Sequence, residues 1–159
     1  MLINSVEFEF LNLLLIHKVR FLIIGGYALR QYGYLREAGD LDIWVDVSGD
    51  NSSRLLNAIE SSPYLSGNGL SSDDLSKPNK EIKLSGVLSL IEILTSLGIM
   101  DFEEADVSKE ISLGKLPVIS AKHLLIAKKF SLKLRRNEKD RLKDEADIKY
   151  LETYLNFSS

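Results

Sequence analysis

The chain has 159 residues, of which 45% are hydrophobic and 27% are charged, and its formal net charge is −3. This composition is typical of a soluble globular protein whose core is large enough to fold without disulfides. With no cysteine and only two histidines, thiolate and histidine-rich zinc sites are excluded, so that any bound metal must be a hard cation held mainly by oxygen, such as Mg²⁺ or Mn²⁺.

The charge is distributed unevenly along the chain. The segment from Lys122 to Lys143 contains nine lysines and arginines against two acidic residues, Glu138 and Asp140, whereas the rest of the chain is acidic. A basic segment beside an acidic body suits a polyanionic ligand such as a nucleotide or RNA. A solvated helix face is the alternative explanation of the same charges.

The chain shows no sign of membrane targeting. Its N-terminal residues lack the basic region and the small-residue cleavage site of a signal peptide. The longest apolar runs, such as residues 11–16 and 21–24, are too short to span a bilayer. A cytoplasmic protein without a membrane partner is therefore expected.

Hydrophobic periodicity and turn residues divide the first half of the chain into alternating helices and strands. Helices are expected at residues 5–17, 27–32 and 51–61, and strands at residues 21–24 and 41–47. Asp50 or Asn51 is expected to cap the third helix. Residues 62–79 are rich in Ser, Asp, Gly, Asn and Pro, which predicts a loop.

The second half of the chain predicts more strands and then two helices. Strands are expected at residues 81–84, 88–94, 111–113 and 116–119, with a helical turn at residues 102–105. Ser120 is expected to cap a helix that runs to about residue 135. A last helix is expected from about residue 140 to residue 155, with an apolar stripe formed by Leu142, Ala146, Leu151 and Leu155.

The segment FLIIGGYALRQYGYLREAGDLDIWVD, residues 21–46, carries the residues best suited to chemistry. Asp40 and Asp42 are two positions apart in a predicted strand, so their side chains are expected to project to one face. Two neighbouring carboxylates repel each other unless a divalent cation lies between them. Mg²⁺ commonly binds one or two carboxylates together with substrate phosphates. Trp44 and Asp46 share this predicted face; Trp44 suits either stacking on a base or closing the core, and the core is favoured.

Gly25 and Gly26 leave the backbone bare at the end of a buried strand, where a phosphate can approach closely and a following helix N-terminus favours negative charge. Arg36 could supply a guanidinium fork to a phosphate. Each feature alone has an ordinary explanation: a solvated carboxylate pair, a turn or a surface cation. Their order within one short segment favours a functional site.

The motifs Gly25-Gly26-Tyr27-Ala28, Arg36 and Asp40-Leu41-Asp42 resemble those of the DNA polymerase beta-like nucleotidyltransferase superfamily. Within it, they are similar to the small prokaryotic branch related to abortive-infection and toxin–antitoxin nucleotidyltransferases. The resemblance covers roughly residues 20–150. It implies an α/β fold with a twisted mixed sheet flanked by helices, in a single domain over residues 1–159 whose core spans about 1–119 and whose C-terminal helical part spans about 120–157.

The resemblance also implies roles for residues further along the chain. Glu92 matches the third carboxylate, which would complete a metal site with Asp40 and Asp42 and help to deprotonate the acceptor. Gly25, Gly26, Arg36 and Lys128 would hold the triphosphate, and Asp144 would orient Lys128 or Arg36. From spacing alone, Arg141–Asp144 and Lys143–Asp147 are ordinary ion pairs on a helix surface, and Lys128 is a lysine that extends along an amphipathic helix.

Two residues depart from the family pattern. The third carboxylate is Glu92 where the family usually has aspartate, and Ala38 stands where a Thr or Ser often precedes the acidic strand. Glutamate reaches one methylene further than aspartate, and alanine removes a hydroxyl that would fix the loop or touch phosphate. Both departures are compatible with a weak or inactive enzyme.

Three functions are therefore carried forward. The first is an Mg²⁺- or Mn²⁺-dependent enzyme that transfers a nucleoside monophosphate from an NTP to a hydroxyl of an RNA end such as that of a tRNA, a protein side chain or a small molecule. It would fit a toxin with an antitoxin protein as partner. The second is an inactive nucleotide- or partner-binding domain on the same fold. The third is an RNA-binding protein that uses residues 122–143 and binds in a strongly salt-dependent manner.

Overall fold

The computed structural model of the protein describes residues 3–37, 39–67, 69–86, 90–135 and 137–158. Within these residues, six strands form one mixed sheet in the order β3-β4-β2-β1-β6-β5. The strands are β1 (Phe21–Ile24), β2 (Leu41–Val45), β3 (Glu81–Ser85), β4 (Leu90–Leu94), β5 (Glu110–Ser112) and β6 (Leu116–Val118). Strand β2 runs antiparallel to β1 and parallel to β4, so that the start of β2 lies beside the end of β1.

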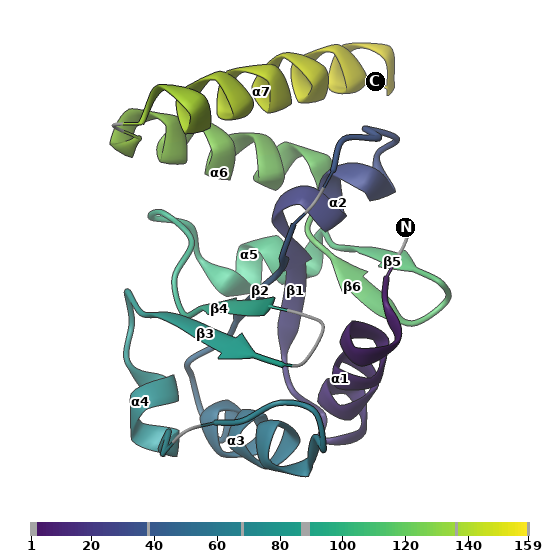
Figure 1. The fold of residues 1–159 in the computed structure, drawn as a ribbon. Coiled ribbons are helices and arrows are strands. Elements are labelled where there is room, and N and C mark those ends of the chain that lie inside the picture. The colour runs from purple at the N-terminus through teal and green to yellow at the C-terminus, as the bar shows by residue number, and fades with distance from the viewer. Residues whose placement is uncertain (1–2, 38, 68, 87–89, 136, 159) are drawn as a thin grey trace.

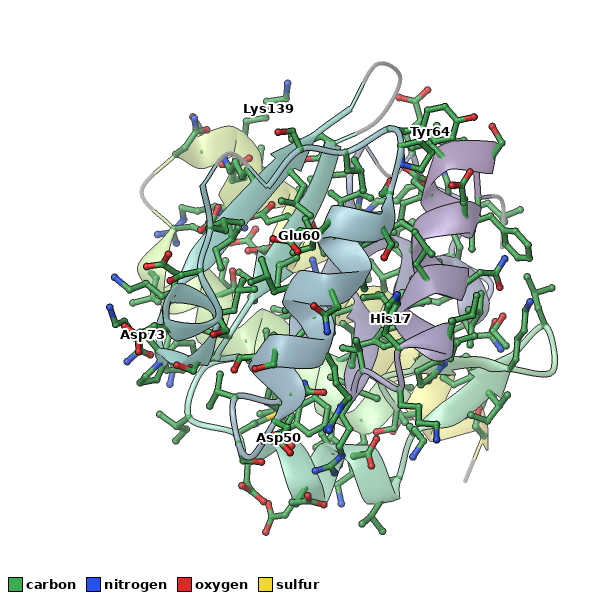
Figure 2. All side chains as sticks on the ribbon, turned by 90° about the horizontal axis from the view of Figure 1, so that it is seen from below. His17, Asp50, Glu60, Tyr64, Asp73 and Lys139 are labelled. Carbon is green, nitrogen blue, oxygen red and sulfur yellow. The ribbon has the colours of Figure 1, made fainter. Side chains whose placement is uncertain are left out.

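Helices α6 (Ala121–Leu134) and α7 (Glu138–Ser158) lie on one side of the molecule and α1 (Ser5–Ile16), α3 (Asn51–Ser61) and α4 (Ser72–Ser76) on the other, with the sheet between them (Figure 1). Seen from below, α1 and α3 cover one side and carry exposed residues such as Glu60 (Figure 2); α6 and α7 pack together on the other. The helices are α1 (Ser5–Ile16), α2 (Gly25–Gln31), α3 (Asn51–Ser61), α4 (Ser72–Ser76), α5 (Phe102–Val107), α6 (Ala121–Leu134) and α7 (Glu138–Ser158). In the described part of the chain, no helix combines the length and apolar character needed to cross a membrane.

The central strands are buried on both faces, which explains their continuous apolar runs. All four residues of β1 are buried, as are Leu41, Ile43, Trp44 and Val45 of β2. Phe10, Leu11 and Leu14 of α1 are fully buried in the same core. A capping box in which Asn4 and Glu7 bond each other's backbone amides starts α1, and the side chain of Ser120 caps α6 as expected.

The predicted elements are all present in the expected order, with one additional helix and some local differences. Residues 62–79 were expected to be a loop, but Ser71 and Asp74 form a capping box that starts the short helix α4. Strand β2 ends at Val45, two residues earlier than expected. Asp50 stands at the N-cap of α3 without a side-chain cap bond, and the side chain of Asn51 bonds the backbone of Arg20 and Asp46. Strand β4 is described from Leu90, and the expected start at Leu88 lies outside the described residues.

The apolar stripe predicted for the last helix is wrong at its first half. Leu142 is 59% exposed and Ala146 is also exposed. The residues of α7 that face the protein are instead Asp144, Asp147 and Leu151, spaced three and four positions apart. Two carboxylates therefore occupy positions that an ordinary amphipathic helix would give to apolar side chains.

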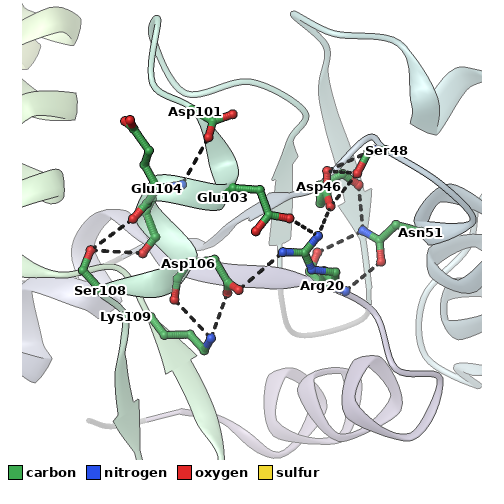
Figure 3. A network of polar contacts seen from close by, with 11 residues as sticks. Arg20, Asp46, Ser48, Asn51, Asp101, Glu103, Glu104, Asp106, Ser108 and Lys109 are labelled. Carbon is green, nitrogen blue, oxygen red and sulfur yellow. Dashed lines mark hydrogen bonds and ion pairs between the residues drawn. The ribbon is translucent and has the colours of Figure 1, made fainter.

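A polar network fixes the sheet at the end opposite the glycines that follow β1 (Figure 3). Nη1 of Arg20, just before β1, lies 2.6 Å from Oδ2 of Asp46, just after β2, and 2.6 Å from Oε1 of Glu103 in α5. The side chain of Asn51 bonds the backbone amide and carbonyl of Arg20 and the carbonyl of Asp46. These contacts tie β1, β2, α3 and α5 together and occupy Asp46, which was expected to share the face of Asp40 and Asp42.

Candidate functional site

Two carboxylates from neighbouring strands form the centre of the site. Asp42 in β2 is paired in register with Glu92 in β4, so that both side chains point to one face of the sheet. Asp40 precedes β2 as a bend residue and does not belong to the strand. Asp40, Asp42 and Glu92 nevertheless line the same cavity, as the sequence led us to expect.

Two cavities adjoin at these carboxylates, between the sheet and the pair α6 and α7. The first, of about 550 Å³, combines apolar side chains such as Leu94, Leu97 and Phe130 with charged ones, and we call it the larger cavity. The second, of about 230 Å³, is lined by Arg36, Asp40, Lys143 and Asp144 among others, and we call it the polar cavity. Asp42, Glu92, Lys128 and Arg135 line both cavities.

Burial and neighbouring negative charges raise the pKa values of Asp42 and Glu92. Burial raises the pKa of Asp42 to about 6, and the negative charge of Asp40 adds to the rise. Burial also raises the pKa of Glu92, to about 8, together with a hydrogen bond to Glu81 and the charge of Asp42. The pKa of Glu81 is lowered, because its carboxylate accepts the hydrogen bond from Glu92. At neutral pH the cluster therefore retains a proton that a divalent cation could displace.

Gly25 presses its backbone against the Asp42 carboxylate. Its φ of +65° lies in the left-handed region, which glycine adopts without strain. A Cβ atom at this position would overlap Oδ2 of Asp42. Gly26 follows, buried, at the start of α2, and it lines the polar cavity. The two glycines therefore form the bare backbone wall that the sequence predicted beside the carboxylates.

The donor atoms fit a metal ion that arrives with a phosphate ligand. Oδ1 of Asp42 is buried and has no hydrogen-bond partner, which leaves a carboxylate oxygen directed at no protein group. Within the described residues, no three acidic or histidine side chains are grouped closely enough to hold a metal on their own. Mg²⁺ suits such a site, because it commonly takes one or two carboxylates and completes its shell with phosphate oxygens and water.

Asp147 of α7 holds the two cations that the sequence assigned to the triphosphate. Nε and Nη2 of Arg36 donate to its two oxygens at 2.7 and 2.8 Å, and Nζ of Lys128 lies 3.0 Å from Oδ2. Asp147 is completely buried. Burial raises the pKa of Asp147, but the bonds from Arg36 and Lys128 outweigh burial and hold the pKa below its usual range.

Asp144 lies one turn earlier on α7 and contacts α6. Its Oδ1 is 3.6 Å from Nζ of Lys128, and its Oδ2 accepts bonds from Ser131 and from Nε of Arg135 at 3.2 Å each. The expected contact between Asp144 and Lys128 is therefore present, whereas Arg36 is bound by Asp147 instead. The surface pairs Arg141–Asp144 and Lys143–Asp147 predicted from spacing are wrong, because both aspartates point inward.

Sequence reasoning missed three residues of this region: Glu81, Arg135 and Asp147. Asp147 had one usable signal, since Asp144, Asp147 and Leu151 follow helical spacing into the protein. Glu81 comes close to Glu92 only through the pairing of β3 with β4. Arg135 ends α6, where the turn toward α7 sets its direction.

Other residues singled out in the sequence lie away from the carboxylates. Trp44 is buried and packs edge-on against Phe102, which confirms the prediction that its side chain belongs to the core. His17 is the C-cap of α1, at the boundary expected for it. His123 lies in the first turn of α6, and its Nδ1 contacts the hydroxyl groups of Ser120 and Ser108. Ala38 lies outside the described residues.

Comparison with solved structures identifies the fold. The chain is similar to ANT(2″)-Ia in complex with adenylyl-2″-tobramycin, with a TM-score of 0.58, 11% identity, and coverage of 92% of this chain and 91% of that one. It is also similar to an antigenic nucleotidyltransferase-like protein from Paracoccidioides brasiliensis, with a TM-score of 0.57, 19% identity, and coverage of 89% of this chain and 71% of that one. A third neighbour is a Thermotoga maritima protein provisionally described as a nucleotidyltransferase, with a TM-score of 0.56, 20% identity, and coverage of 93% of this chain and 89% of that one.

These neighbours confirm the expected fold class. The six-stranded mixed sheet with flanking helices is a nucleotidyltransferase-like fold. No protein-family model matches the chain, and no curated protein matches it at a significant level.

Proposed function

We propose that the protein transfers a nucleoside monophosphate from an NTP to a hydroxyl acceptor in a reaction that depends on Mg²⁺ or Mn²⁺. The observation that carries the proposal is the pairing of Asp42 with Glu92 in register beside the bare backbone of Gly25. The shared fold supports it, and one neighbour was solved with adenylyl-2″-tobramycin, which carries an adenylyl group on a small molecule.

Each residue has a part in the reaction. Asp40 and Asp42, with Glu92 beside them, would hold the metal, which when bound neutralises phosphate charge and orients the reacting oxygens. Gly25 and Gly26 admit the phosphates against bare backbone. Lys128, fixed by Asp147 and Asp144, supplies positive charge where both cavities meet.

The chemistry is an in-line displacement at the α-phosphorus. The acceptor oxygen forms a bond to phosphorus while the bond to the bridging oxygen of the β-phosphate breaks, and pyrophosphate leaves with that electron pair. The proton of the acceptor hydroxyl passes to a carboxylate, and we assign this part to the ionised form of Glu92, which lines both cavities.

Labelling of defined pools tests the proposal and identifies the acceptor. The protein is incubated with each α-labelled NTP and Mg²⁺ in the presence of total RNA, lysate protein or a small-molecule filtrate. We expect label in one pool for the wild type and none for Asp42→Ala. Label in the RNA or protein pool would also be the starting point for testing a toxin with an antitoxin partner, the setting that the sequence resemblance implies.

A nucleotide-binding domain without catalysis is the second candidate. It is favoured by Glu92 in place of aspartate and by the lack of a preformed group of three metal ligands in the described part of the chain. If wild type and Asp42→Ala are equally inert while both bind nucleotide, this second function replaces the first.

A further inference from the structure

Arg36, the arginine that the sequence assigned to phosphate, is fully engaged with the protein. Each of its three nitrogens donates to a protein acceptor: Nε and Nη2 to Asp147, and Nη1 to the carbonyl of Glu37 at 2.8 Å. Its side chain is only 17% exposed. A phosphate would have to compete with a buried carboxylate for this guanidinium, so Arg36 is better suited to fixing Asp147 and the loop before β2.

Arg135 has a guanidinium group whose two terminal nitrogens are available to a ligand. Only its Nε is engaged, at 3.2 Å from Asp144, and among the described residues Nη1 and Nη2 have no hydrogen-bond partner. The side chain is 47% exposed and lines both cavities. With Nε anchored, the two terminal nitrogens present a planar pair of donors that matches two phosphate oxygens.

Lys143 has an open ammonium for a related reason. Spacing along α7 pairs it with Asp147, but Asp147 is buried and taken by Arg36 and Lys128. Lys143 is exposed, lines the polar cavity and forms no ion pair with any residue that the structure describes. Because the side chain of Asp147 points into the protein, Lys143 is available to a ligand.

We propose that Arg135 and Lys143 bind the terminal phosphates of the NTP, in the polar cavity at the corner between α6 and α7. This inference rests on the proposed function and names a phosphate site that the sequence did not predict. It also determines the side from which the acceptor hydroxyl approaches the α-phosphorus. With the pyrophosphate in the polar cavity, in-line geometry brings the acceptor hydroxyl from the larger cavity, across Asp42 and Glu92.

The same cavity makes binding depend on a divalent cation. Besides its cations, the polar cavity is lined by Asp40, Asp42, Glu92, Asp140 and Asp144. These five carboxyl groups lie beside the four lining cations, so the cavity offers a bare polyphosphate no net positive charge. A polyphosphate that carries Mg²⁺ brings the positive charge that the carboxylates require, so we expect tripolyphosphate to bind with Mg²⁺ and not in EDTA.

A phosphate-dependent affinity series tests the assignment. Dissociation constants are measured by calorimetry for ATP, ADP, AMP and tripolyphosphate, each with Mg²⁺, on wild type, Arg135→Gln and Lys143→Gln. For the wild type, we expect affinity to rise from AMP to ATP. Each variant should bind ATP and tripolyphosphate about ten-fold more weakly, because a charge-assisted hydrogen bond is lost, while its affinity for AMP stays unchanged.

Matched controls come from α7, the helix of Lys143. Arg141→Gln and Lys139→Gln remove the same charges from exposed positions that line neither cavity, and they should bind all four ligands as the wild type does. Equal weakening for AMP and ATP would show that Arg135 or Lys143 only maintains structure, and unchanged affinity for ATP would also overturn the assignment. A wild type that binds none of the ligands would overturn the proposed function as well.

Discussion

Gly25 and Asp42 lie so close that a Cβ atom on Gly25 would overlap Oδ2 of Asp42 and lie 3.3 Å from the Asp42 Cβ atom. We expect Gly25→Ala to displace the Asp42 carboxylate and to abolish Mg²⁺-dependent transfer. Gly49→Ala is the matched control, because Gly49 has a similar φ of +60° and no atom within 4 Å of the added carbon. Both variants should lose about 1 kcal/mol of stability through backbone strain, whereas only Gly25→Ala should lose transfer. Equal activity in the two variants would contradict this role.

Asp42→Asn should stabilise the protein while it abolishes the proposed transfer. The pKa of Asp42 is raised to about 6 in the folded state, against roughly 3.9 in the unfolded chain. Ionisation of Asp42 therefore disfavours folding, and this penalty grows as the pH rises from 3.9 through 6. We expect the free energy of unfolding of Asp42→Asn to exceed that of the wild type by ~2 kcal/mol at pH 8.

The same comparison in acid is the control for that prediction. At pH 4 Asp42 is already protonated in the folded protein, so the two proteins should have nearly equal stability. Urea titrations at pH 4 and pH 8 without metal give the four values required. A variant that is less stable than the wild type at pH 8 would show that the carboxylate is held by favourable contacts and is not strained by its neighbours.

Mg²⁺ affinity should rise steeply between pH 6 and pH 8.5. The pKa of Asp42 is about 6 and that of Glu92 is about 8 in the metal-free protein, so that both carry protons in the lower part of this range. A metal must displace those protons, and its apparent affinity increases as they dissociate. We expect a gain of at least about ten-fold by calorimetry, accompanied by proton release. Glu92→Gln should remove the part of the rise above pH 7.

Asp147→Asn should destabilise the protein more than any exposed carboxylate of α7. The substitution leaves the largely buried Arg36 and Lys128 without the charge that Asp147 supplies, at a cost of about 3 kcal/mol. Glu145→Gln, at an exposed position of the same helix, is the control. The folded-state pKa of Asp147 is lowered, so its contribution is present above pH 4 and disappears as the pH falls through that lowered value. A difference between wild type and Asp147→Asn that persists undiminished at pH 2 would exclude this account.

Local patterns in the sequence were sufficient for the motif and for most elements. The buried strand β1, the glycines after it and the aspartates around β2 follow one another within residues 21–46, so spacing and periodicity could place them together. Strand pairing adds information that no local pattern contains. The contact of Asp42 with Glu92 across the sheet, and of Glu92 with Glu81, depends on which strands pair and in which register.

The errors on α7 have a physical origin. Aspartates in a charged helix are usually solvated, so Asp144 and Asp147 looked like partners of Arg141 and Lys143. The helix instead docks with its acidic face inward, because Arg36 and Lys128 present positive charge there. Tyr150 helps to hold this orientation by donating a hydrogen bond to the carbonyl of Tyr32. A buried ion pair between distant segments cannot be recognised from either segment alone.

Helix α7 is translated after every other element that contributes to the carboxylate cluster and its cations. While a nascent chain lacks residue 147, Arg36 and Lys128 have no Asp147 to bind. The proposed site can therefore be completed only after residues 144 and 147 have been synthesised.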